Sequence, residues 1–366
     1  MKIAYDFQAF SQCYGGVALY FSKLAAHISS SLAETRIFAP IFQNRYVHSL
    51  PTQMVEGKFL AQYPRKTKRI IWKLNQILSS SKIRAWHPDI LHQTYYDYSP
   101  ASLGEKVRIV TVYDMIHELF PNSFLASDRT SLLKLNVIKR ADQIICISEC
   151  TRRDLINLTG IDEKKVACIY LGVDAVIDRL DPPITPRDSS KPYILFVGAR
   201  TPYKNFIGLL EAYASSARLS NDFNLLALGG GFFTKSELQK MRDLQLSPQK
   251  VVHVNADLDH LNTYYQHASA FIYPSLYEGF GLPPLEAMAN GCPVISSNTG
   301  PLPEINGDAA EYFNPADRSA MIEAIENVVY SASRAKELKS FGYAQFRKYS
   351  WDQCAAQTYA LYQRLL

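Results

Sequence analysis

The chain has 366 residues, enough for two domains that each bury a hydrophobic core. Hydrophobic residues make up 47%, which excludes a disordered chain, and no apolar run approaches the roughly 20 residues that a membrane span needs. The net charge of +5 arises at residues 57–84, which carry eight Lys or Arg and no acid, so a general nucleic-acid coat is excluded.

Neither the amino terminus nor the cysteines point to export or to a metal site. Residues Met1–Asp6 indicate a β-strand rather than a signal peptide, and the six cysteines include no Cys-x-x-Cys pair. We therefore expect a cytoplasmic protein without a zinc site or a disulfide framework.

Short apolar runs alternate with longer amphipathic stretches along the chain, a rhythm typical of βαβ units. The amphipathic stretches include Val17–Ser30 and Arg129–Arg140, and Ser148 followed by Glu149 predicts the start of a helix at Thr151–Leu158. The predicted fold class is α/β, with parallel sheets covered by helices on both faces. The expected strands are Lys2–Asp6, Arg36–Pro40, Ile90–Thr94, Ile109–Tyr113, Gln143–Ile147, Ile194–Gly198, Leu225–Gly229, Val251–Val254, Ala270–Pro274 and Val294–Ser297.

A proline-rich stretch at residues 178–192 predicts a linker between two domains. We expect an N-terminal domain at 1–180, a C-terminal domain at 190–348, and a final helix at 349–366 that returns to the first domain. Ligands of such sheets bind at the carboxyl ends of the strands, so two facing domains predict a site in a central cleft.

The strongest indication of chemistry lies at residues 270–291, AFIYPSLYEGFGLPPLEAMANG. A strand is followed by a loop with Gly279 and Gly281, and then by a helix that Pro283 and Pro284 open. Backbone N–H groups and the positive end of the helix dipole make such a turn an anion site.

Two carboxylates flank this expected anion site, Glu278 before it and Glu286 within the helix. Carboxylates accept hydrogen bonds from hydroxyl groups, so the pair predicts a ligand that combines a phosphate with a sugar or a ribose. The alternative is an ordinary surface helix with two solvated acids.

A second segment, residues 193–213, places Arg200 and Lys204 in the loop after a strand. Two cations at this edge of a sheet can bind a diphosphate, Arg as a planar fork and Lys as a point charge. The alternative is a solvated basic loop.

Together these segments resemble the signature of glycosyltransferase family 4, whose fold is GT-B, with two Rossmann-like domains. The resemblance rests on Glu278-x7-Glu286 within YEGFGLPPLEAMANGCPV and covers nearly the whole chain, most specifically residues 193–316. Further segments in the family's order are Gly15-Gly16, Ser148-Glu149, Leu171–Asp174, the Arg200/Lys204 loop and Gly300–Glu304. The segments YDFQAFSQCYGGVALYFSKLA and VTVYDMIHELFP resemble the mannosyltransferase branch that builds bacterial surface polysaccharides.

The resemblance implies a role for each matching residue. Arg200 and Lys204 would bind the donor diphosphate, Glu286 the ribose hydroxyls and Glu278 the donor sugar. The further donor-binding positions would be the N–H groups of Phe280, Gly281 and Leu282, the close backbone approach at Gly15 and Gly16, and a base site near Val254 and residues 229–231.

The chain departs from the family where Tyr113-Asp114 stands in place of the usual His-Asp. Either His117 covers the histidine's role or Asp114 alone holds the transferred sugar. His92, in LHQTYYDYSP, is a candidate on the acceptor side, as is His117, although a lone histidine is more often structural. In addition, Ala199 displaces the arginine by one position relative to many family members.

The implied reaction is a retaining transfer, with GDP-mannose as the favoured donor and a saccharide or lipid-linked saccharide as the acceptor, in O-antigen or exopolysaccharide synthesis. Protein cations would stabilise the leaving diphosphate in place of a metal ion, so we expect no metal and no cofactor. The alternatives are a UDP-sugar transferase of the same fold, a sugar phosphorylase, a glycosidase with paired carboxylates, and a nucleotide-sugar binder without activity.

Within residues 57–84, Ile70, Ile71, Leu74, Ile77 and Leu78 recur at helical spacing beside the clustered cations. Such a helix can lie on an anionic membrane surface, which would place the protein at the inner face of the cytoplasmic membrane. The alternative is that the apolar stripe packs on the domain core and the cations are only solvated.

Overall fold

A computed structural model describes residues 1–28, 32–97, 102–174, 191–254 and 260–366. The chain divides into two compact units, Met1–Gly172 with Ser350–Leu366, and Val173–Tyr349. The first unit is called unit 1 and the second unit 2. The expected linker at 178–192 lies almost entirely outside the described residues.

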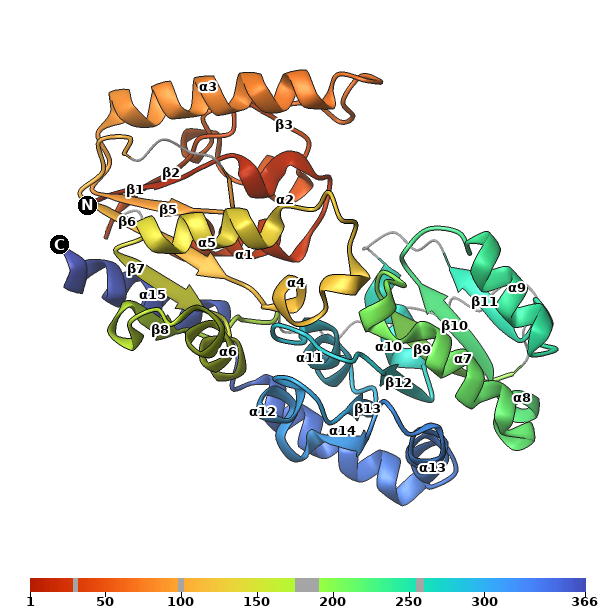
Figure 1. Cartoon of the computed structure of the whole chain (residues 1–366). Coiled ribbons are helices and arrows are strands. Elements are labelled where there is room, and N and C mark those ends of the chain that lie inside the picture. Colours follow the sequence, from red (N-terminus) through yellow and green to blue (C-terminus); the bar gives the residue numbers. More distant parts are fainter. Residues whose placement is uncertain (29–31, 98–101, 175–190, 255–259) are drawn as a thin grey trace. The chain divides into compact units, whose positions relative to one another are not determined.

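Unit 1 is built on a parallel sheet in the order β2-β1-β5-β6-β7-β8 (Figure 1). The strands β5, β6 and β7 are buried along their whole length, as expected of parallel strands covered by helices on both faces. The bounds are β1 Lys2–Tyr5, β2 Glu34–Ile37, β5 Ile90–Gln93, β6 Val107–Val112, β7 Gln143–Cys146 and β8 Val166–Cys168, with a separate pair β3 Ile41–Phe42 and β4 Lys58–Phe59.

The helices of unit 1 connect these strands, and the last of them returns from the end of the chain. Helix α15 packs against α1, and Tyr362 on α15 is fully buried in the unit's core. The bounds are α1 Gly16–His27, α2 Arg45–His48, α3 Lys68–Trp86, α4 Ile116–Leu119, α5 Thr130–Arg140, α6 Glu149–Thr159 and α15 Trp351–Leu365.

Unit 2 repeats the plan with a parallel sheet in the order β11-β10-β9-β12-β13-β14. Its core joins β9, β10 and β12 to the apolar faces of α7 and α13. The strands are β9 Tyr193–Val197, β10 Asn224–Leu228, β11 Val251–Val254, β12 Ala270–Tyr273, β13 Val294–Ser297 and β14 Ala310–Phe313. The helices are α7 Phe206–Ser215, α8 Ala217–Asp222, α9 Lys235–Asp243, α10 Leu261–His267, α11 Leu282–Ala289, α12 Leu302–Asn306, α13 Arg318–Val329 and α14 Ala332–Phe346.

The sequence pattern located most of these elements to within two residues. The strand expected at Arg36–Pro40 lies at Glu34–Ile37 instead, and the edge strands β8 and β14 were not expected. Both are short, and β14 has the sequence AEYF, which is not an apolar run. Among the described residues, no helix is both long enough and apolar enough to cross a bilayer.

Candidate functional site

The predicted donor residues of unit 2 lie at the carboxyl ends of two neighbouring strands. Strands β9 and β12 pair in parallel, so the loops that follow them leave the same edge of the sheet. The Leu276 amide donates to the Tyr203 carbonyl oxygen at 2.7 Å, which ties the two loops together. The structure therefore brings Lys204 and Glu278 to one place.

Lys204 forms a buried ion pair with Glu278. Its Nζ donates to Glu278 Oε1 at 2.6 Å and to the Tyr273 hydroxyl at 2.8 Å. Burial by itself would lower the pKa of Lys204, but the Glu278 carboxylate and the Tyr273 hydroxyl raise it above its ordinary value. Lys204 is therefore a fixed positive charge in the loop that opens α7.

Helix α11 begins beside this pair, at Leu282, and Gly281 is its N-cap residue. The φ of Gly281 is +106°, in the left-handed region that favours glycine, and a Cβ there would approach Leu302 Cδ2 to 2.8 Å. The next positions, Pro283 and Pro284, lack an N–H, so the only backbone N–H groups near the start of this helix that fit the predicted anion contact are those of Phe280, Gly281 and Leu282, and this contact stays a prediction.

Glu286 lies one turn further along α11. The Tyr265 hydroxyl donates to Glu286 Oε2 at 3.3 Å. Burial raises the pKa of Glu286 to about 7, opposed by the Tyr265 hydrogen bond and assisted by the negative charge of Asp174. Hydroxyl groups of a ligand that donate hydrogen bonds to this buried carboxylate would stabilise its charged form.

Arg200 has partners that differ from the predicted diphosphate contact. Its Nε donates to Glu237 Oε1 at 2.7 Å, and its terminal nitrogens donate to the carbonyl oxygens of Gly229, Gly231 and Phe232. Only 3% of the Arg200 side chain is exposed. In the structure Arg200 therefore holds the glycine turn after β10, and its contact with the donor diphosphate stays a prediction.

That turn, Gly229–Gly231, has positive φ at each position and leads to Phe232, which is 83% exposed. The Phe232 ring lies 5.4 Å from the ring of His253, next to Val254 at the end of β11. The sequence predicted a base site here but did not single out Phe232. An aromatic residue after a glycine turn is the signal that could have identified it as a stacking surface.

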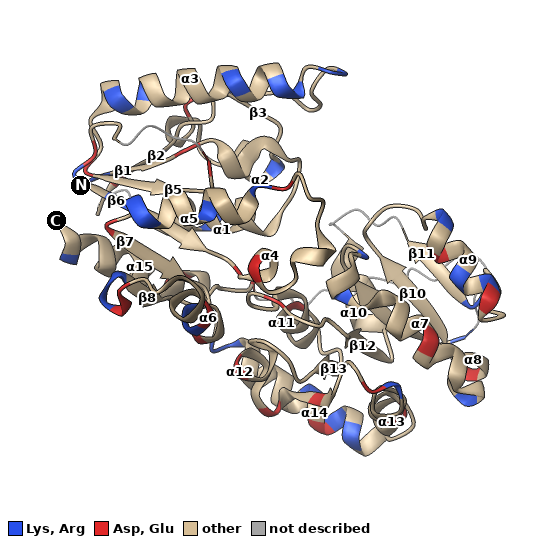
Figure 2. Cartoon of the chain, viewed as in Figure 1, with Lys and Arg blue, Asp and Glu red and all other residues tan. Residues whose placement is uncertain are grey.

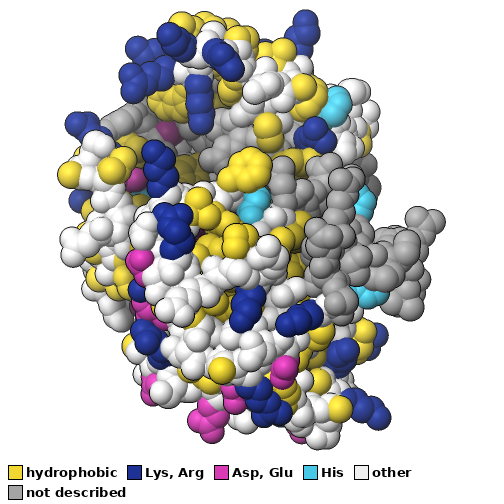
Figure 3. Space-filling model, turned by 90° about the vertical axis from the view of Figure 1, so that its right-hand side faces the viewer, with side chains coloured by type: hydrophobic (Ala, Val, Ile, Leu, Met, Phe, Trp, Pro, Cys, Tyr) yellow, Lys and Arg dark blue, Asp and Glu magenta, His cyan; other side chains and the backbone are white. Residues whose placement is uncertain are grey.

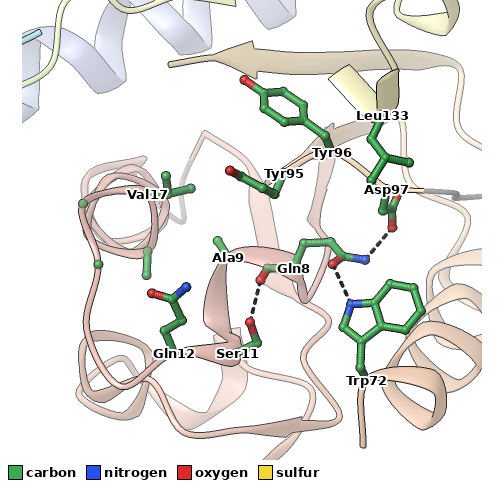
Figure 4. Close-up of a pocket in the computed structure, with 13 residues that line it drawn as sticks. Gln8, Ala9, Ser11, Gln12, Val17, Trp72, Tyr95, Tyr96, Asp97 and Leu133 are labelled. Atoms are coloured by element: carbon green, nitrogen blue, oxygen red, sulfur yellow. Dashed lines mark hydrogen bonds between the residues drawn. The ribbon is translucent and has the colours of Figure 1, made fainter. Parts of the chain in front are cut away.

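Unit 1 holds a cavity of about 480 Å³ at the carboxyl ends of β1 and β5 (Figure 4). Gly15 and Gly16 line it at the start of α1, a helix without a side-chain cap, and their approach to phosphates or to an acceptor stays a prediction. The other lining residues are Gln8, Ala9, Ser11, Gln12, Val17, Ala18, Trp72, Tyr95, Tyr96, Asp97 and Leu133.

Three side chains that line this cavity are connected by hydrogen bonds. The Trp72 indole N–H donates to Gln8 Oε1 at 3.2 Å, and the Gln8 amide donates to Asp97 (Figure 4). At the end of β1, burial and the nearby charge of Asp97 raise the pKa of Asp6 to about 7, although Thr94 donates two hydrogen bonds to Asp6. Aromatic faces beside carboxylate and amide groups suit a polyhydroxylated ligand.

His92 does not line this cavity, which corrects its assignment as an acceptor-side candidate. The residue is fully buried on β5, and its two ring nitrogens hydrogen-bond the hydroxyls of Tyr362 and Thr111. Burial lowers the pKa of His92 to about 3, so the ring is a neutral part of the core. Tyr95 and Asp97, beyond the end of the same strand, are the residues that reach the cavity.

Asp114 and His117 lie around the short helix α4. Asp114 Oδ1 accepts a hydrogen bond from the Ile116 amide at 3.0 Å, which opens the helix. The His117 ring stacks on Phe124 at 3.9 Å between centroids, and its Nε2 lies 3.8 Å from Asp128 Oδ2. Its Nδ1 is buried without a hydrogen-bond partner, so His117 keeps an unused donor or acceptor.

Within the described ranges, no three His, Cys, Asp or Glu side chains gather as a group that could hold a metal ion.

Two family profiles match this chain, one in each unit. Residues 14–176 match the profile described as "Glycosyltransferase Family 4", and residues 178–345 match "Glycosyl transferases group 1". Together they cover nearly all of the chain, with the first profile on unit 1 and the second on unit 2.

Curated relatives include two O-antigen chain mannosyltransferases. The chain is 29% identical over 221 residues to RfbU of Salmonella typhimurium, a stretch that covers 60% of each protein. It is 28% identical over 274 residues to O-antigen chain mannosyltransferase B of Escherichia coli, covering 70% of this chain and 71% of that protein. The match to RfbU thus leaves over a third of that relative unaligned.

Solved structures of similar fold include the sucrose-phosphate synthase of Thermosynechococcus elongatus, with a TM-score of 0.74, 19% identity and coverage of 100% of this chain and 99% of that one. Anabaena HepE in complex with UDP and glucose has a TM-score of 0.71 at 18% identity, with coverage of 100% and 99%. The glycosyltransferase WaaG, of lipopolysaccharide biosynthesis, has a TM-score of 0.72 at 10% identity and 99% coverage of both chains. At these identities the likeness establishes the GT-B fold.

Proposed function

We propose that this chain, which belongs to glycosyltransferase family 4, transfers a hexose from a nucleoside-diphosphate donor to a saccharide acceptor. The observation that carries the proposal is the unit 2 site, in which a buried cation, a glycine N-cap and two glutamates occupy one sheet edge. A cation and a helix N-terminus suit a diphosphate, and glutamates suit hydroxyl groups.

The proposed donor is GDP-mannose. Its support is the similarity to two proteins named as O-antigen chain mannosyltransferases. In the site, Glu286 would accept from the ribose hydroxyls and Phe232 would stack on the base. Glu278 would accept from the sugar, since its second carboxylate oxygen is not the one that Lys204 binds.

In the proposed reaction the bond between the anomeric carbon and the donor phosphate breaks, and negative charge grows on the leaving diphosphate. Lys204 and the start of α11 would stabilise this charge because both are in place before the reaction begins. We propose retention of the anomeric configuration, with a donor phosphate oxygen taking the acceptor's proton. Glu278 is poorly suited to act as a free nucleophile because Lys204 binds it.

We propose that the cavity of unit 1 receives the saccharide acceptor. Its aromatic residues Trp72, Tyr95 and Tyr96 and its polar residues Gln8 and Asp97 support this choice. The names of the relatives support a saccharide of surface-polysaccharide synthesis as the acceptor. A lipid-linked saccharide also fits this site, because the surface helix α3 supplies Trp72 to the cavity.

A donor panel tests the proposal. GDP-mannose, UDP-glucose and UDP-N-acetylglucosamine are compared by thermal shift, since a ligand of the native state raises the melting temperature. GDP-mannose is expected to give the largest shift and to be turned over with a saccharide acceptor in the presence of EDTA. Turnover of a UDP-sugar alone would overturn the choice of mannose, and loss of activity with EDTA that Mg²⁺ or Mn²⁺ restores would overturn metal-free transfer.

Three outcomes would indicate a neighbouring activity instead. Hydrolysis of an aryl glycoside without any nucleotide would indicate a glycosidase. Transfer that requires inorganic phosphate would indicate a phosphorylase, and tight donor binding without turnover would indicate a binding protein.

A further inference from the structure

Helix α3 presents an apolar stripe away from its own unit. Ile70, Leu74, Ile77 and Leu78 are 61%, 44%, 67% and 43% exposed. Their spacing of four, three and one residues places them on one face of the helix. Figure 1 shows α3 along the outer side of unit 1, beside the strand pair that contains β3.

The opposite face of α3 attaches the helix to unit 1 through different residues. Asn75 donates to and accepts from the backbone of Ile41 at 2.7 and 2.8 Å, and the Ser79 hydroxyl donates to the Phe38 carbonyl at 2.8 Å. Ile83 is fully buried in the cluster that contains Phe38. The exposed stripe is therefore not needed to hold the helix in place.

Exposed cations accompany the stripe. Lys73 and Arg84 flank it along the helix, Lys68 and Arg69 lie in the first turn, and no acid is present on α3. Figure 2 shows Lys and Arg, and no Asp or Glu, along this helix. Figure 3 shows Lys and Arg gathered with hydrophobic side chains over the end of unit 1 where α3 begins.

An apolar stripe between cations on a long surface helix is the pattern of a helix that lies in a membrane interface. We propose that the outward face of α3 binds an anionic lipid surface, with Ile70, Leu74, Ile77 and Leu78 entering the acyl boundary and Arg69, Lys73 and Arg84 meeting the headgroups. Charge complementarity favours this occupant, because a two-fold interface with a second copy would place these cations against themselves.

If α3 binds a lipid surface, one edge of the unit 1 cavity lies next to that surface. Trp72 on the inner side of α3 lines that cavity, two residues from the exposed Ile70 and Leu74. An acceptor attached to a lipid could then enter the cavity while its tail stays in the bilayer. This last step rests on the proposed function, whereas the binding of α3 to lipid does not.

Flotation with liposomes tests the lipid surface directly. The full chain is mixed with vesicles of phosphatidylcholine, with or without phosphatidylglycerol, and the vesicle-bound fraction is measured. Wild type is expected to float only with the anionic vesicles and to be released by salt, which screens exposed charges. Recovery of wild type in the bottom fraction with phosphatidylglycerol vesicles would overturn the proposal.

Two variants assign the binding to α3. Arg69→Ser with Lys73→Ser should lower vesicle affinity about thirtyfold, since two headgroup contacts are lost. Ile70→Ser with Ile77→Ser should abolish flotation at low salt, because the apolar area that enters the bilayer is removed. These side chains are exposed, so circular dichroism is expected to show an unchanged melting temperature.

Matched control variants remove the same kinds of exposed side chain from other helices. Lys336→Ser with Lys339→Ser removes two exposed cations from α14, and Leu158→Ser removes an exposed leucine from α6. Both should float like wild type, and equal losses in controls and α3 variants would overturn the assignment. A wild-type dimer that becomes monomeric in Ile70→Ser with Ile77→Ser, without flotation of either, would show instead that the stripe binds a second copy.

The donor assay keeps this proposal separate from the proposed function. The α3 variants should retain the thermal shift with GDP-mannose, because none of their residues belongs to unit 2. If wild type floats with anionic vesicles but no donor shifts its melting temperature, the lipid proposal is supported and only the donor proposal fails.

Discussion

Replacing Lys204 by Met should destabilise unit 2 as well as stop transfer, because the substitution leaves the Glu278 carboxylate buried without its cation. Glu278 is 8% exposed, and its Oε1 lies 2.6 Å from Lys204 Nζ. Removing one partner of a buried ion pair typically costs about 3–5 kcal/mol, whereas removing both is often nearly neutral.

We therefore expect Lys204→Met to lose about 3 kcal/mol of unfolding free energy, because the Glu278 carboxylate stays buried after its partner is removed.

Differential scanning calorimetry measures this effect. A loss of about 3 kcal/mol should lower the melting temperature by roughly 6–12 °C for a domain of this size. The double variant Lys204→Met with Glu278→Gln carries no buried charge and should recover most of that shift, although it remains inactive. A double variant no more stable than Lys204→Met would refute the reasoning.

Donor affinity, measured by isothermal titration calorimetry, should increase with pH through about 7, because Glu286 ionises there and only the carboxylate accepts strongly from ribose hydroxyls. Glu286→Gln should flatten this profile and lower affinity at about pH 8 roughly tenfold, and a flat wild-type profile would argue against the ribose contact. Arg200→Lys should raise the KM for the donor about tenfold and leave kcat nearly unchanged, because a single ammonium cannot hold Glu237 and the glycine turn together. An equal fall in kcat and kcat/KM would instead return Arg200 to direct contact with the leaving group. His92→Phe should cost about 2 kcal/mol in chemical denaturation, because the buried Tyr362 hydroxyl loses its bond to His92 and the Thr111 hydroxyl keeps only its bond to Tyr20, and a changed acceptor KM would contradict the place of His92 in the core.

The sequence pattern predicted the parallel α/β sheets and the setting of Lys204 and Glu278 because these signals are local, whereas the GT-B fold was predicted from the resemblance to the family. A buried parallel strand is an apolar run, and the loop that follows it is marked by glycine, proline and charge within a few residues. Parallel pairing then places such loops at a common edge without further information, as β9 and β12 show.

What could not be predicted depends on contacts far apart in the chain. His92 bonds to Tyr362, 270 residues away, so its burial is invisible from the segment around it. The periodicity of α3 marked an apolar stripe but grouped the buried Ile71 with the exposed Ile70 and Leu74. The attachment through Asn75 and Ser79 decides which face turns outward, and polar side chains on a packed face carry no apolar signal.

The return of α15 to unit 1 has a consequence for biosynthesis. Unit 2 is a continuous stretch, Val173–Tyr349, whereas unit 1 needs both Met1–Gly172 and Ser350–Leu366. During translation, unit 2 can complete its fold before residues 350–366 leave the ribosome, while the α1 surface is still uncovered and His92 still lacks Tyr362. Unit 1, whose first segment is made before unit 2, is therefore completed after it, and nascent chains shortened by a premature stop codon in α15 would be natural clients of chaperones and proteases.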